Sequence, residues 1–439
     1  MKISLHNTLL RRKKEITPID ENNVRMYVCG PTVYDRAHLG NAKTSVVFDV
    51  LYRFLCQVYG KDHVTYVSNI TDVDDKIIKA AVAEGVDASV ISQRYIAECK
   101  KDMEGLNVKP ATKHPLATEE IGGMIDMIKK LIDGGHAYVA KDGTVYYRTR
   151  SFKDYGKLSH KNLDDLRGGN RELKVSGEEQ KEDPLDFVLW KPKKEGEPYW
   201  QSPWCDGRPG WHIECSVMSK RYLGDEIDIH AGGEDLIFPH HENEIAQSEA
   251  ANGVPFARYW MHNAFLNINN KKMSKSLGNF FTVRDISEKY DLQVLRFFML
   301  SAHYRSPLNF SADLMEAAKN GLERITTAAE NLAFVAEKTA VKEMTAEEAE
   351  KVKETDVFVK KFEDAMEDDF NTADAVSAVF ELVKFANTEV KDTSSAEFAE
   401  KVLSVLKTLT DILGLIVVKE KESDAEIDAL IEERQAARK

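Results

Sequence analysis

The sequence predicts an α/β protein with a doubly wound parallel sheet, a subdomain inserted into that sheet, and a C-terminal α-helical bundle. Three observations predict this fold class. Strand and helix patterns alternate over residues 1–120, they resume after an interruption over residues 121–203, and residues 311–439 have the Ala, Glu, Lys and Leu content of helices. An alternating βαβ order favours a parallel sheet that binds ligands at the carboxyl ends of its strands.

The first half of the sheet domain starts with a short apolar strand over residues 24–28. Cys29-Gly30-Pro31 ends this strand, and residues 41–59 then carry apolar positions at helical spacing. His38 and Asn41 therefore fall at the start of a helix, where unpaired N–H groups and the positive end of the helix dipole attract anions. The alternative is a helix start that is capped by its own side chains and binds no ligand.

The remaining elements follow in order along residues 62–203. A second strand is expected over residues 62–69, and a helix begins within residues 74–83. The insertion contains a helix, then a hairpin over residues 137–148 with Asp142-Gly143 at its turn, then a polar stretch over residues 167–183.

The second half of the sheet domain is expected over residues 204–265. Residues 227–230 have the pattern of a strand and lead into Gly232-Gly233-Glu234-Asp235. Glycines at a strand end allow the backbone to approach a sugar or base closely, and Asp235 can accept hydrogen bonds from hydroxyls. A simple turn is the competing interpretation.

Length and charge limit the class of protein. The 439 residues suffice for about three domains, and no apolar run approaches the ~20 residues of a membrane span. The first 15 residues lack the apolar segment of a secretory signal, which predicts a cytoplasmic protein. Residues 311–439 contain 17 Lys and Arg against 30 Asp and Glu, and so carry the whole net charge of −13. Any RNA must therefore be bound by local basic patches.

Two of the five cysteines lie beside other chemically active residues. No Cys-x-x-Cys pair occurs, and Cys29 ends the first strand while Cys215 follows Trp211 by four residues. A helix over residues 239–247 would place His240 and Glu244 on one face. Two thiolates, an imidazole and a carboxylate can form a tetrahedral zinc site. The alternative is an ordinary polar helix face.

A third signal is the loop Lys272-Met273-Ser274-Lys275-Ser276, which ends near Gly278. Two ammonium groups three residues apart on such a loop can contact a polyphosphate. By itself the pair is a weak signal, because such pairs occur on many solvated surfaces. The lysine pair becomes a stronger indication of polyphosphate binding because the helix start at His38 and Asn41 offers a second phosphate contact.

Taken together in this order, the motifs resemble those of the cysteinyl-tRNA synthetases, a family of class I aminoacyl-tRNA synthetases. The resemblance extends along essentially the whole chain. It rests on four stretches besides the Lys272 loop: Met26-Tyr27-Val28-Cys29-Gly30-Pro31-Thr32-Val33-Tyr34-Asp35, Asn69-Ile70-Thr71-Asp72-Val73-Asp74-Asp75-Lys76, Gly210-Trp211-His212-Ile213-Glu214-Cys215-Ser216 and the segment that begins at His240.

The resemblance implies roles for particular residues. It implies zinc ligands at Cys29, Cys215, His240 and Glu244, and a cysteine pocket at Thr71 and Trp211. It implies ATP contacts at His38, Gly40, Asn41, Gly232, Gly233, Asp235 and Lys275, with catalytic roles for His38, Asn41, Lys272 and Lys275. Residues 266–310 would carry the second signature and contact the tRNA stem, and residues 311–439 would bind the anticodon side.

The implied activity is a ligase reaction in two steps. L-Cysteine and ATP, with Mg²⁺, would give cysteinyl-adenylate, and the 3′-terminal adenosine of tRNA(Cys) would then take the aminoacyl group. The sulfur of cysteine would join the zinc ion, because zinc prefers soft thiolate to a serine hydroxyl. The protein is expected to act as a cytoplasmic monomer without membrane contact.

Two departures from the family pattern stand out. The first signature usually ends in His, where this chain has Asn41, which can donate a hydrogen bond but carries no charge. Family members also usually continue into a small basic module beyond the position of Lys439, and without it we expect adenylate formation to persist and tRNA recognition to weaken. Two other functions stay open: a ligase that joins cysteine to a small amino sugar, and a non-catalytic RNA-binding protein with a structural zinc.

Overall fold

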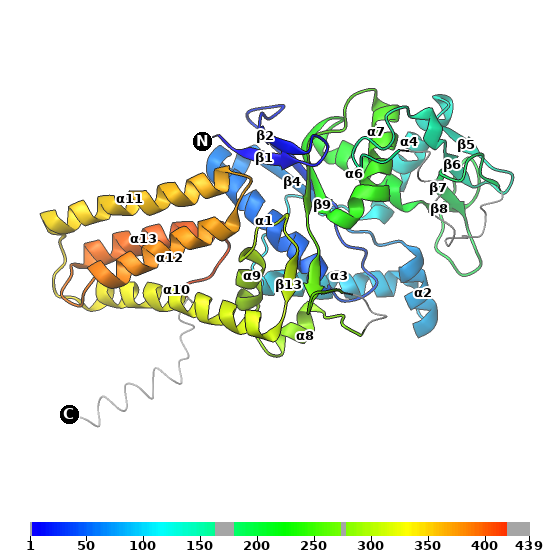
Figure 1. Ribbon diagram of the computed structural model, residues 1–439. Helices are drawn as coiled ribbons and strands as arrows, with labels where there is room; N and C mark the ends of the chain where they lie inside the picture. The colour runs from blue at the N-terminus through cyan, green and yellow to red at the C-terminus, as the bar shows by residue number, and fades with distance from the viewer. Residues whose placement is uncertain (1, 163–179, 274–277, 419–439) are drawn as a thin grey trace.

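The computed structural model describes residues 2–162, 180–273 and 278–418, and a four-stranded parallel sheet lies at its centre (Figure 1). The sheet has the order β10-β9-β3-β4, so β3 starts in the middle and the chain adds strands on both sides of it. The doubly wound parallel sheet predicted from the sequence is confirmed. Its strands are β3 Val24–Val28, β4 Val64–Ser68, β9 Ile227–Gly233 and β10 Ala257–Asn263.

Apolar residues cover both faces of this sheet, as is typical of parallel strands. On β3, Met26 shares a core with Val46 and Phe54 of helix α1. The next residue, Tyr27, points to the other face and shares a second core with Ile213 of helix α6. Helices therefore cover both faces, and the carboxyl ends of the strands stay accessible for a site.

The helices of the sheet domain begin at recognisable caps. Asp74 and Asp87 accept hydrogen bonds from the first turns of α2 and α3. The helices are α1 Leu39–Tyr59, α2 Asp75–Glu84, α3 Ala88–Gly105, α6 Trp211–Leu223 and α7 Glu242–Asn252. Before β3, the hairpin of β1 Ser4–Asn7 and β2 Arg12–Glu15 lies beside β10, where Thr8 N donates to Trp260 O at 2.8 Å.

The inserted part contains helix α4 and a four-stranded antiparallel sheet. Helix α4 spans Ile121–Asp133, and the sheet order is β5-β6-β7-β8. The predicted hairpin is present as β5 and β6. The last strand, β8, lies beyond residue 203, where the sequence placed the end of the insertion. The strands are β5 Ala137–Val139, β6 Val145–Tyr147, β7 Phe187–Pro192 and β8 Gly207–Pro209.

After β10 the chain forms a small mixed sheet and then the helical bundle. The small sheet has the order β12-β11-β13 and is followed along the chain by the four long helices on one side of the molecule (Figure 1). The predicted C-terminal bundle is confirmed. The elements are β11 Leu266–Ile268, β12 Lys271–Lys272, α8 Val283–Ser287, α9 Leu292–Leu300, β13 Leu308–Phe310, α10 Ala312–Lys338, α11 Ala346–Glu367, α12 Thr372–Glu389 and α13 Ala396–Ile412.

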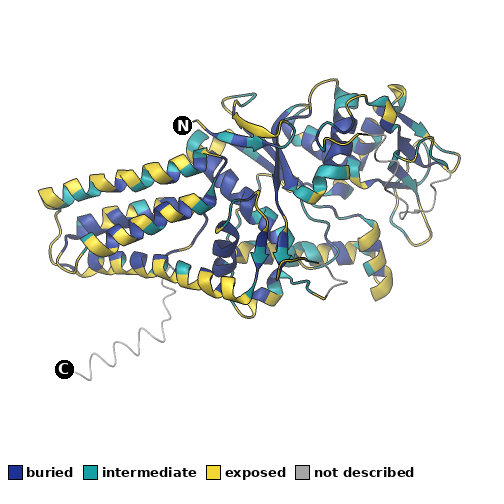
Figure 2. Cartoon of the chain, viewed as in Figure 1, coloured by how far each residue is buried: buried dark blue, intermediate teal, exposed yellow. Residues whose placement is uncertain are grey.

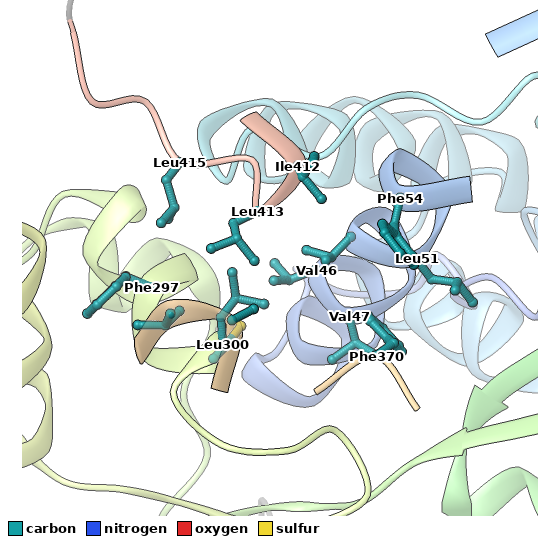
Figure 3. Close-up of a cluster of buried hydrophobic side chains, with 14 of the residues drawn as sticks. Val46, Val47, Leu51, Phe54, Phe297, Leu300, Phe370, Ile412, Leu413 and Leu415 are labelled. Carbon is teal, nitrogen blue, oxygen red and sulfur yellow. The ribbon is translucent and has the colours of Figure 1, made fainter. Parts of the chain in front are cut away.

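Apolar packing joins the bundle to the sheet domain. Val46 and Leu51 of α1, Leu300 of α9 and Leu413 after α13 belong to one buried cluster (Figure 3). The outer faces of the bundle helices are exposed, whereas the inner faces are buried (Figure 2). Among the helices of the described residues, we find none with the length and apolar character needed to cross a membrane.

Candidate metal centre and nucleotide site

The predicted metal ligands meet at the carboxyl ends of the two central strands. Cys29 directly follows β3, and its N–H donates to Ala231 O of β9 at 3.1 Å. Cys215 lies in α6, and Glu244 lies in the first turn of α7. The direction in which strands are added reverses between β3 and β9, and open α/β sheets bind ligands at such a switch point.

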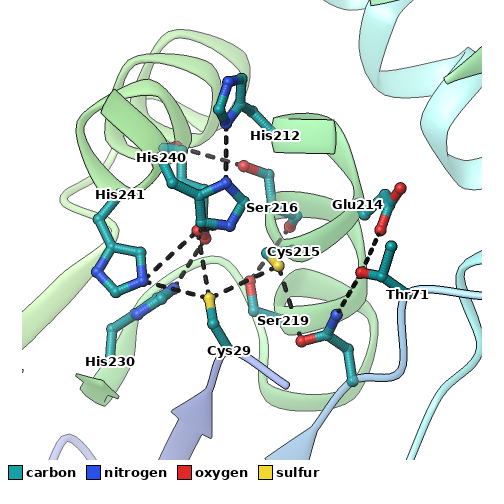
Figure 4. Close-up of polar contacts among 12 residues, drawn as sticks. Cys29, Thr71, His212, Glu214, Cys215, Ser216, Ser219, His230, His240 and His241 are labelled. Atoms are coloured by element: carbon teal, nitrogen blue, oxygen red, sulfur yellow. Dashed lines mark hydrogen bonds and ion pairs between the residues drawn. The ribbon is translucent and has the colours of Figure 1, made fainter. Parts of the chain in front are cut away.

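Four buried donor groups converge here (Figure 4). The ligand atoms of Cys29, Cys215, His240 and Glu244 all lie within 4.8 Å of one another. The two Sγ atoms are 3.6 Å apart, and Cys29 Sγ is 3.4 Å from Glu244 Oε1. His240 Nε2 lies 3.0 Å from the same carboxylate oxygen. We call this set the metal cluster.

The separations in the metal cluster fit tetrahedral zinc. Bonds of about 2.3 Å to sulfur and about 2.1 Å to nitrogen or oxygen imply sulfur–sulfur, sulfur–oxygen and nitrogen–oxygen distances of about 3.8, 3.6 and 3.4 Å. The measured distances are slightly shorter than each of these. Two thiols with an imidazole and a carboxylate are donor types that zinc accepts, so the residues present fit the ion that the sequence predicts.

The charges of the cluster are also suited to a cation. Burial alone would raise the pKa of Glu244, but the adjacent His230 and His240 hold it well below its usual value. The thiol of Cys29 donates a hydrogen bond to Cys215 and lowers the pKa of Cys215 to about 6. A carboxylate and a thiolate are thus favoured at neutral pH without any exposure to solvent.

Additional histidines orient the cluster, and the sequence analysis did not identify them. His212 Nδ1 lies 2.8 Å from His240 Nδ1, and His230 Nε2 lies 2.8 Å from Glu244 Oε2. Partners of this kind fix the tautomer and direction of metal ligands. The position of His212 next to the predicted pocket residue Trp211 could have indicated its role. His230 lies inside the buried strand β9, where the sequence pattern gives no such indication.

A second set of donors shares two members with the metal cluster. Cys29 and Glu244 also lie within 4.8 Å of His230 and His241, and His241 Nε2 is 3.3 Å from Cys29 Sγ. This second set has one thiol where the first has two, and soft thiolate ligands favour zinc. His241 also pairs through Nδ1 with His262 Nε2 at 2.8 Å. The first set therefore remains our predicted ligand set.

The helix that carries Glu244 begins later than the sequence predicts. Regular helix starts at Glu242, whereas the prediction began at Pro239. Phe238 has an extended backbone (φ −140°, ψ 130°), because a residue before proline is disfavoured in the helical region. His240 and Glu244 still lie one turn apart and in contact.

The two predicted cysteine-pocket residues border the metal cluster. Thr71 follows β4 and donates from Oγ1 to Glu214 Oε2 at 2.8 Å, beside Cys215 in the sequence. Trp211 starts α6, and its ring stacks on His240 with centroids 4.0 Å apart. Trp211 is itself 39% exposed, so its ring extends from the surface to the buried His240.

The first nucleotide signature forms a capped helix start. His38 Nδ1 accepts from Gly40 N at 3.1 Å and Asn41 N at 3.2 Å, while Asn41 Oδ1 accepts from His38 N at 3.3 Å. This reciprocal arrangement is a capping box. With Nδ1 as acceptor, a neutral ring carries its proton on Nε2, which can donate to a phosphate. The helix start is therefore capped, and Asn41 shares in the cap through its oxygen.

Met273 of the second signature and the segment after the signature lie beside this helix start. Leu39 N donates to Phe281 O at 3.1 Å, and Val283 N donates to Ala37 O at 2.9 Å. A Cβ added to Gly40 would lie 3.8 Å from Met273 Cε. Lys272 belongs to β12, and Lys275 lies outside the described residues.

The two predicted nucleotide-site glycines, Gly232 and Gly233, lie at the end of β9. A Cβ added to Gly233 would lie 2.5 Å from Asp235 Oδ1 and 3.9 Å from Thr44 Oγ1 of α1. A Cβ added to Gly232 would lie 2.9 Å from Leu236 Cδ1. Side chains larger than hydrogen would thus crowd Asp235, Leu236 and His241, which follow β9.

The chain is similar to known proteins along most of its length. Residues 15–320 match the family of tRNA synthetases class I (C) catalytic domain, and residues 361–417 match the DALR domain. The cysteine–tRNA ligase of Lachnospira eligens is 68% identical over 99% of this chain and 93% of its own length. That of Clostridioides difficile is 54% identical over all of this chain and 93% of its own.

Solved structures support the fold. A methionyl-tRNA synthetase of Mycobacterium tuberculosis, bound by methionyl-adenylate, has a TM-score of 0.66 at 14% identity over 89% of this chain and 92% of its own. A leucyl enzyme of Agrobacterium radiobacter, solved with tRNA, has a TM-score of 0.64 at 11% identity over 91% of this chain and 85% of its own. By its catalytic-domain match and its curated relatives, the chain belongs to the cysteinyl-tRNA synthetase family of class I aminoacyl-tRNA synthetases.

Proposed function

We propose that this chain activates L-cysteine with ATP and transfers it to the 3′-terminal adenosine of tRNA(Cys). The observation that carries the proposal is the position of the metal cluster: two thiols, an imidazole and a carboxylate meet at the carboxyl end of β3, the strand that leads into the helix with the first signature. A thiol-selecting group and a phosphate-binding group can then act on the two ends of one small amino acid. The identity to cysteine–tRNA ligases supports the same activity.

In the first step, the carboxylate of cysteine attacks the α-phosphorus of ATP and pyrophosphate leaves. A bound zinc ion would select cysteine over serine by accepting the soft sulfur as a further ligand. Cys29, Cys215, His240 and Glu244 would hold this ion, while Thr71 and Trp211 enclose the amino acid. Such discrimination is hard to achieve by shape alone, because the two amino acids differ by one atom.

The residues of the two signatures bind the phosphates of ATP and stabilise their charge. His38 can donate from Nε2. Asn41 can donate from its amide nitrogen, because its amide oxygen already accepts the hydrogen bond from His38 N in the helix cap. Gly40, Gly232, Gly233 and Asp235 surround the nucleotide, and Lys272 and Lys275 neutralise charge that develops on the phosphate, together with Mg²⁺. The catalytic effect comes mainly from positioning and electrostatic stabilisation.

In the second step, the helical bundle supports tRNA as the acceptor. Residues 311–439, which contain the DALR match, form the anticodon-side domain. The protein acts as a cytoplasmic monomer. The alternative acceptor, a small amino sugar, needs no anticodon-side domain. The four helices of the bundle therefore favour tRNA.

Pyrophosphate exchange and acceptor choice test the proposal. We expect exchange of labelled pyrophosphate into ATP to require L-cysteine and to remain at background with L-serine. We expect the purified protein to charge tRNA(Cys) and to leave glucosamine-type amines unmodified. Equal exchange with serine would contradict selection by the metal cluster, and transfer to the amine alone would contradict the tRNA step.

A further inference from the structure

A lysine on helix α1 is buried, and its ammonium group is bound by main-chain carbonyls. Lys43 is 1% exposed, and it lies five residues after His38. Its ammonium donates to Ala264 O at 2.7 Å and to Ser306 O at 3.2 Å, with Phe265 O at 3.4 Å. All three acceptors are main-chain carbonyls from a region more than 200 residues further along the chain.

These carbonyls mark the root of the small sheet β12-β11-β13. Strand β10 ends at Asn263 and β11 begins at Leu266, so Ala264 and Phe265 form the connection between the two sheets. Ser306 lies two residues before β13, the parallel neighbour of β11. One ammonium group therefore holds both chain segments that enter the small sheet. Strand β12 of that sheet contains Lys272 and leads into the second signature.

The same connection is held from its other side by the nucleotide-site loop. Glu234 Oε1 accepts a hydrogen bond from Phe265 N at 2.8 Å. Glu234 directly follows Gly233, at the end of β9. The peptide that enters β11 is thus fixed by a cation from α1 and an anion from the β9 loop, which are the two elements that border the nucleotide.

A buried ammonium group is costly unless its hydrogen bonds compensate for the lost water. Among the described residues, no carboxylate lies within 4 Å of Lys43 Nζ, and burial lowers the pKa of Lys43 to about 8. Apolar side chains fill the surrounding core at lower cost. The charge of Lys43 in this core is therefore better explained by a need to position the small sheet than by a gain in stability.

The far end of the small-sheet region also contacts α1. The segment after the second signature hydrogen-bonds to residues 37 and 39, and Met273 approaches Gly40. Helix α1 therefore contacts this region twice, near the signature through its first turn and at the root through Lys43. Because one helix makes both contacts, they fix the position and the direction of the small-sheet region relative to α1.

We propose that Lys43 is a positioning residue for adenylate formation, which fixes the root of the β12-β11-β13 sheet relative to the first turn of α1. It touches neither nucleotide nor amino acid, and it acts through the carbonyls of Ala264, Phe265 and Ser306. This inference rests on the proposed function, because the quantity that it affects is the ATP-dependent step. A misplacement of about 1 Å in such a step reduces its rate by about 100-fold.

The test compares Lys43→Met with Lys43→Arg and with the control Lys100→Met, an exposed lysine of α3. Pyrophosphate exchange gives kcat and the KM values for ATP and cysteine, while zinc content and thermal unfolding are measured on the same samples. We expect Lys43→Met to lower kcat/KM for ATP about 10- to 100-fold. Zinc content and the affinity for cysteine should stay within twofold of wild type, and Lys43→Arg should recover most of the loss.

Two results would overturn the inference. One is exchange by Lys43→Met that matches the wild type and Lys100→Met. The other is a loss that affects cysteine affinity, zinc content and the unfolding temperature together and that arginine does not repair, since that indicates a general structural role. A wild-type protein that shows no cysteine-dependent exchange would instead contradict the proposed function, so the two failures can be told apart.

Discussion

The metal cluster and the helical bundle bury side chains of opposite kinds: ionisable groups in the cluster and apolar groups in the bundle. The cluster gathers ionisable groups from the end of β3, from α6, from the segment before α7 and from the first turn of α7, and all four of its members are buried. The bundle buries apolar residues that recur at helical spacing along consecutive helices. One region depends on chemistry between distant segments, and the other depends on local pattern and packing.

This difference predicts how each region responds to change. Loss of one donor in the cluster should weaken binding of the proposed zinc ion and of cysteine, while the large cores of the sheet domain stay intact. Loss of apolar volume in the bundle lowers the free energy of unfolding but does not touch a donor. Substitutions in the two regions should therefore separate activity from stability.

The largest effect is expected for Cys215→Ser. A partner of a metal ligand is typically worth about 10- to 100-fold in metal affinity or activity, so the loss of a direct ligand should exceed about 100-fold in cysteine-dependent exchange. Bound zinc, measured by elemental analysis, should fall in parallel. Cys205→Ser removes a thiol outside the metal cluster and serves as the control. Unchanged zinc content in Cys215→Ser would show that the ligand set is wrong.

Leu406→Ala tests the bundle side of the comparison. Leu406 is fully buried in α13, and a Leu→Ala change in a core costs about 2–5 kcal/mol. We expect a lower unfolding midpoint in denaturant with normal zinc content per folded chain. Leu314→Ala on α10, where the side chain is exposed, should change stability by less than about 0.5 kcal/mol. A loss of zinc in folded Leu406→Ala would mean that the two regions are not independent.

The same contrast explains how much the sequence could predict. The parallel sheet and the bundle depend on periodicity and βαβ order, which are visible along the chain, and both predictions are confirmed. The β1–β2 hairpin was missed because Arg12–Glu15 is a strand of four charged, exposed residues without an apolar alternation. Its register depends on neighbours such as β10, which only the tertiary fold supplies.

The site was predictable where family motifs mark it and not elsewhere. The four metal-cluster residues were inferred from motifs, and the structure brings them together. His230 and His262 have no local signal, because each belongs to a strand whose neighbours are apolar or buried. Lys43 gave none either, since a lysine near a helix start is usually solvent-exposed and its partners lie in residues 264–306.

Asp369 lies where the helical bundle meets the sheet domain, and Asp369→Asn tests the coupling of these two parts. Its buried carboxylate accepts from His6 N, Tyr304 Oη and Arg305 Nε, each at 2.7 Å, and so joins the α11–α12 turn to the sheet domain. We expect a loss of about 1–3 kcal/mol in stability, because a buried charge-assisted network loses its anion. The KM for tRNA should rise while cysteine-dependent exchange stays normal.

The neighbouring substitution Asp368→Asn is the matched control. Asp368 pairs with Lys13 at 2.6 Å, but both side chains are largely exposed, and an exposed ion pair contributes about 0–1 kcal/mol. If Asp368→Asn and Asp369→Asn raise the KM for tRNA equally, charge near the turn matters and the buried junction does not. If exchange falls in Asp369→Asn, the junction also supports the activation step.

The smallest effect is expected for Ser395→Ala, at the start of α13. Ser395 Oγ accepts from Phe398 N at 3.2 Å and donates to Glu348 Oε2 of α11 at 2.9 Å. A helix cap is worth about 0.5–2 kcal/mol, and this one also links two helices, so a loss near 1–2 kcal/mol is expected in denaturant unfolding. Ser404→Ala, at an exposed position inside α13, should be neutral or slightly stabilising, because alanine favours the helix interior. Equal effects of the two substitutions would show that the Ser395 cap does not contribute to the stability of α13.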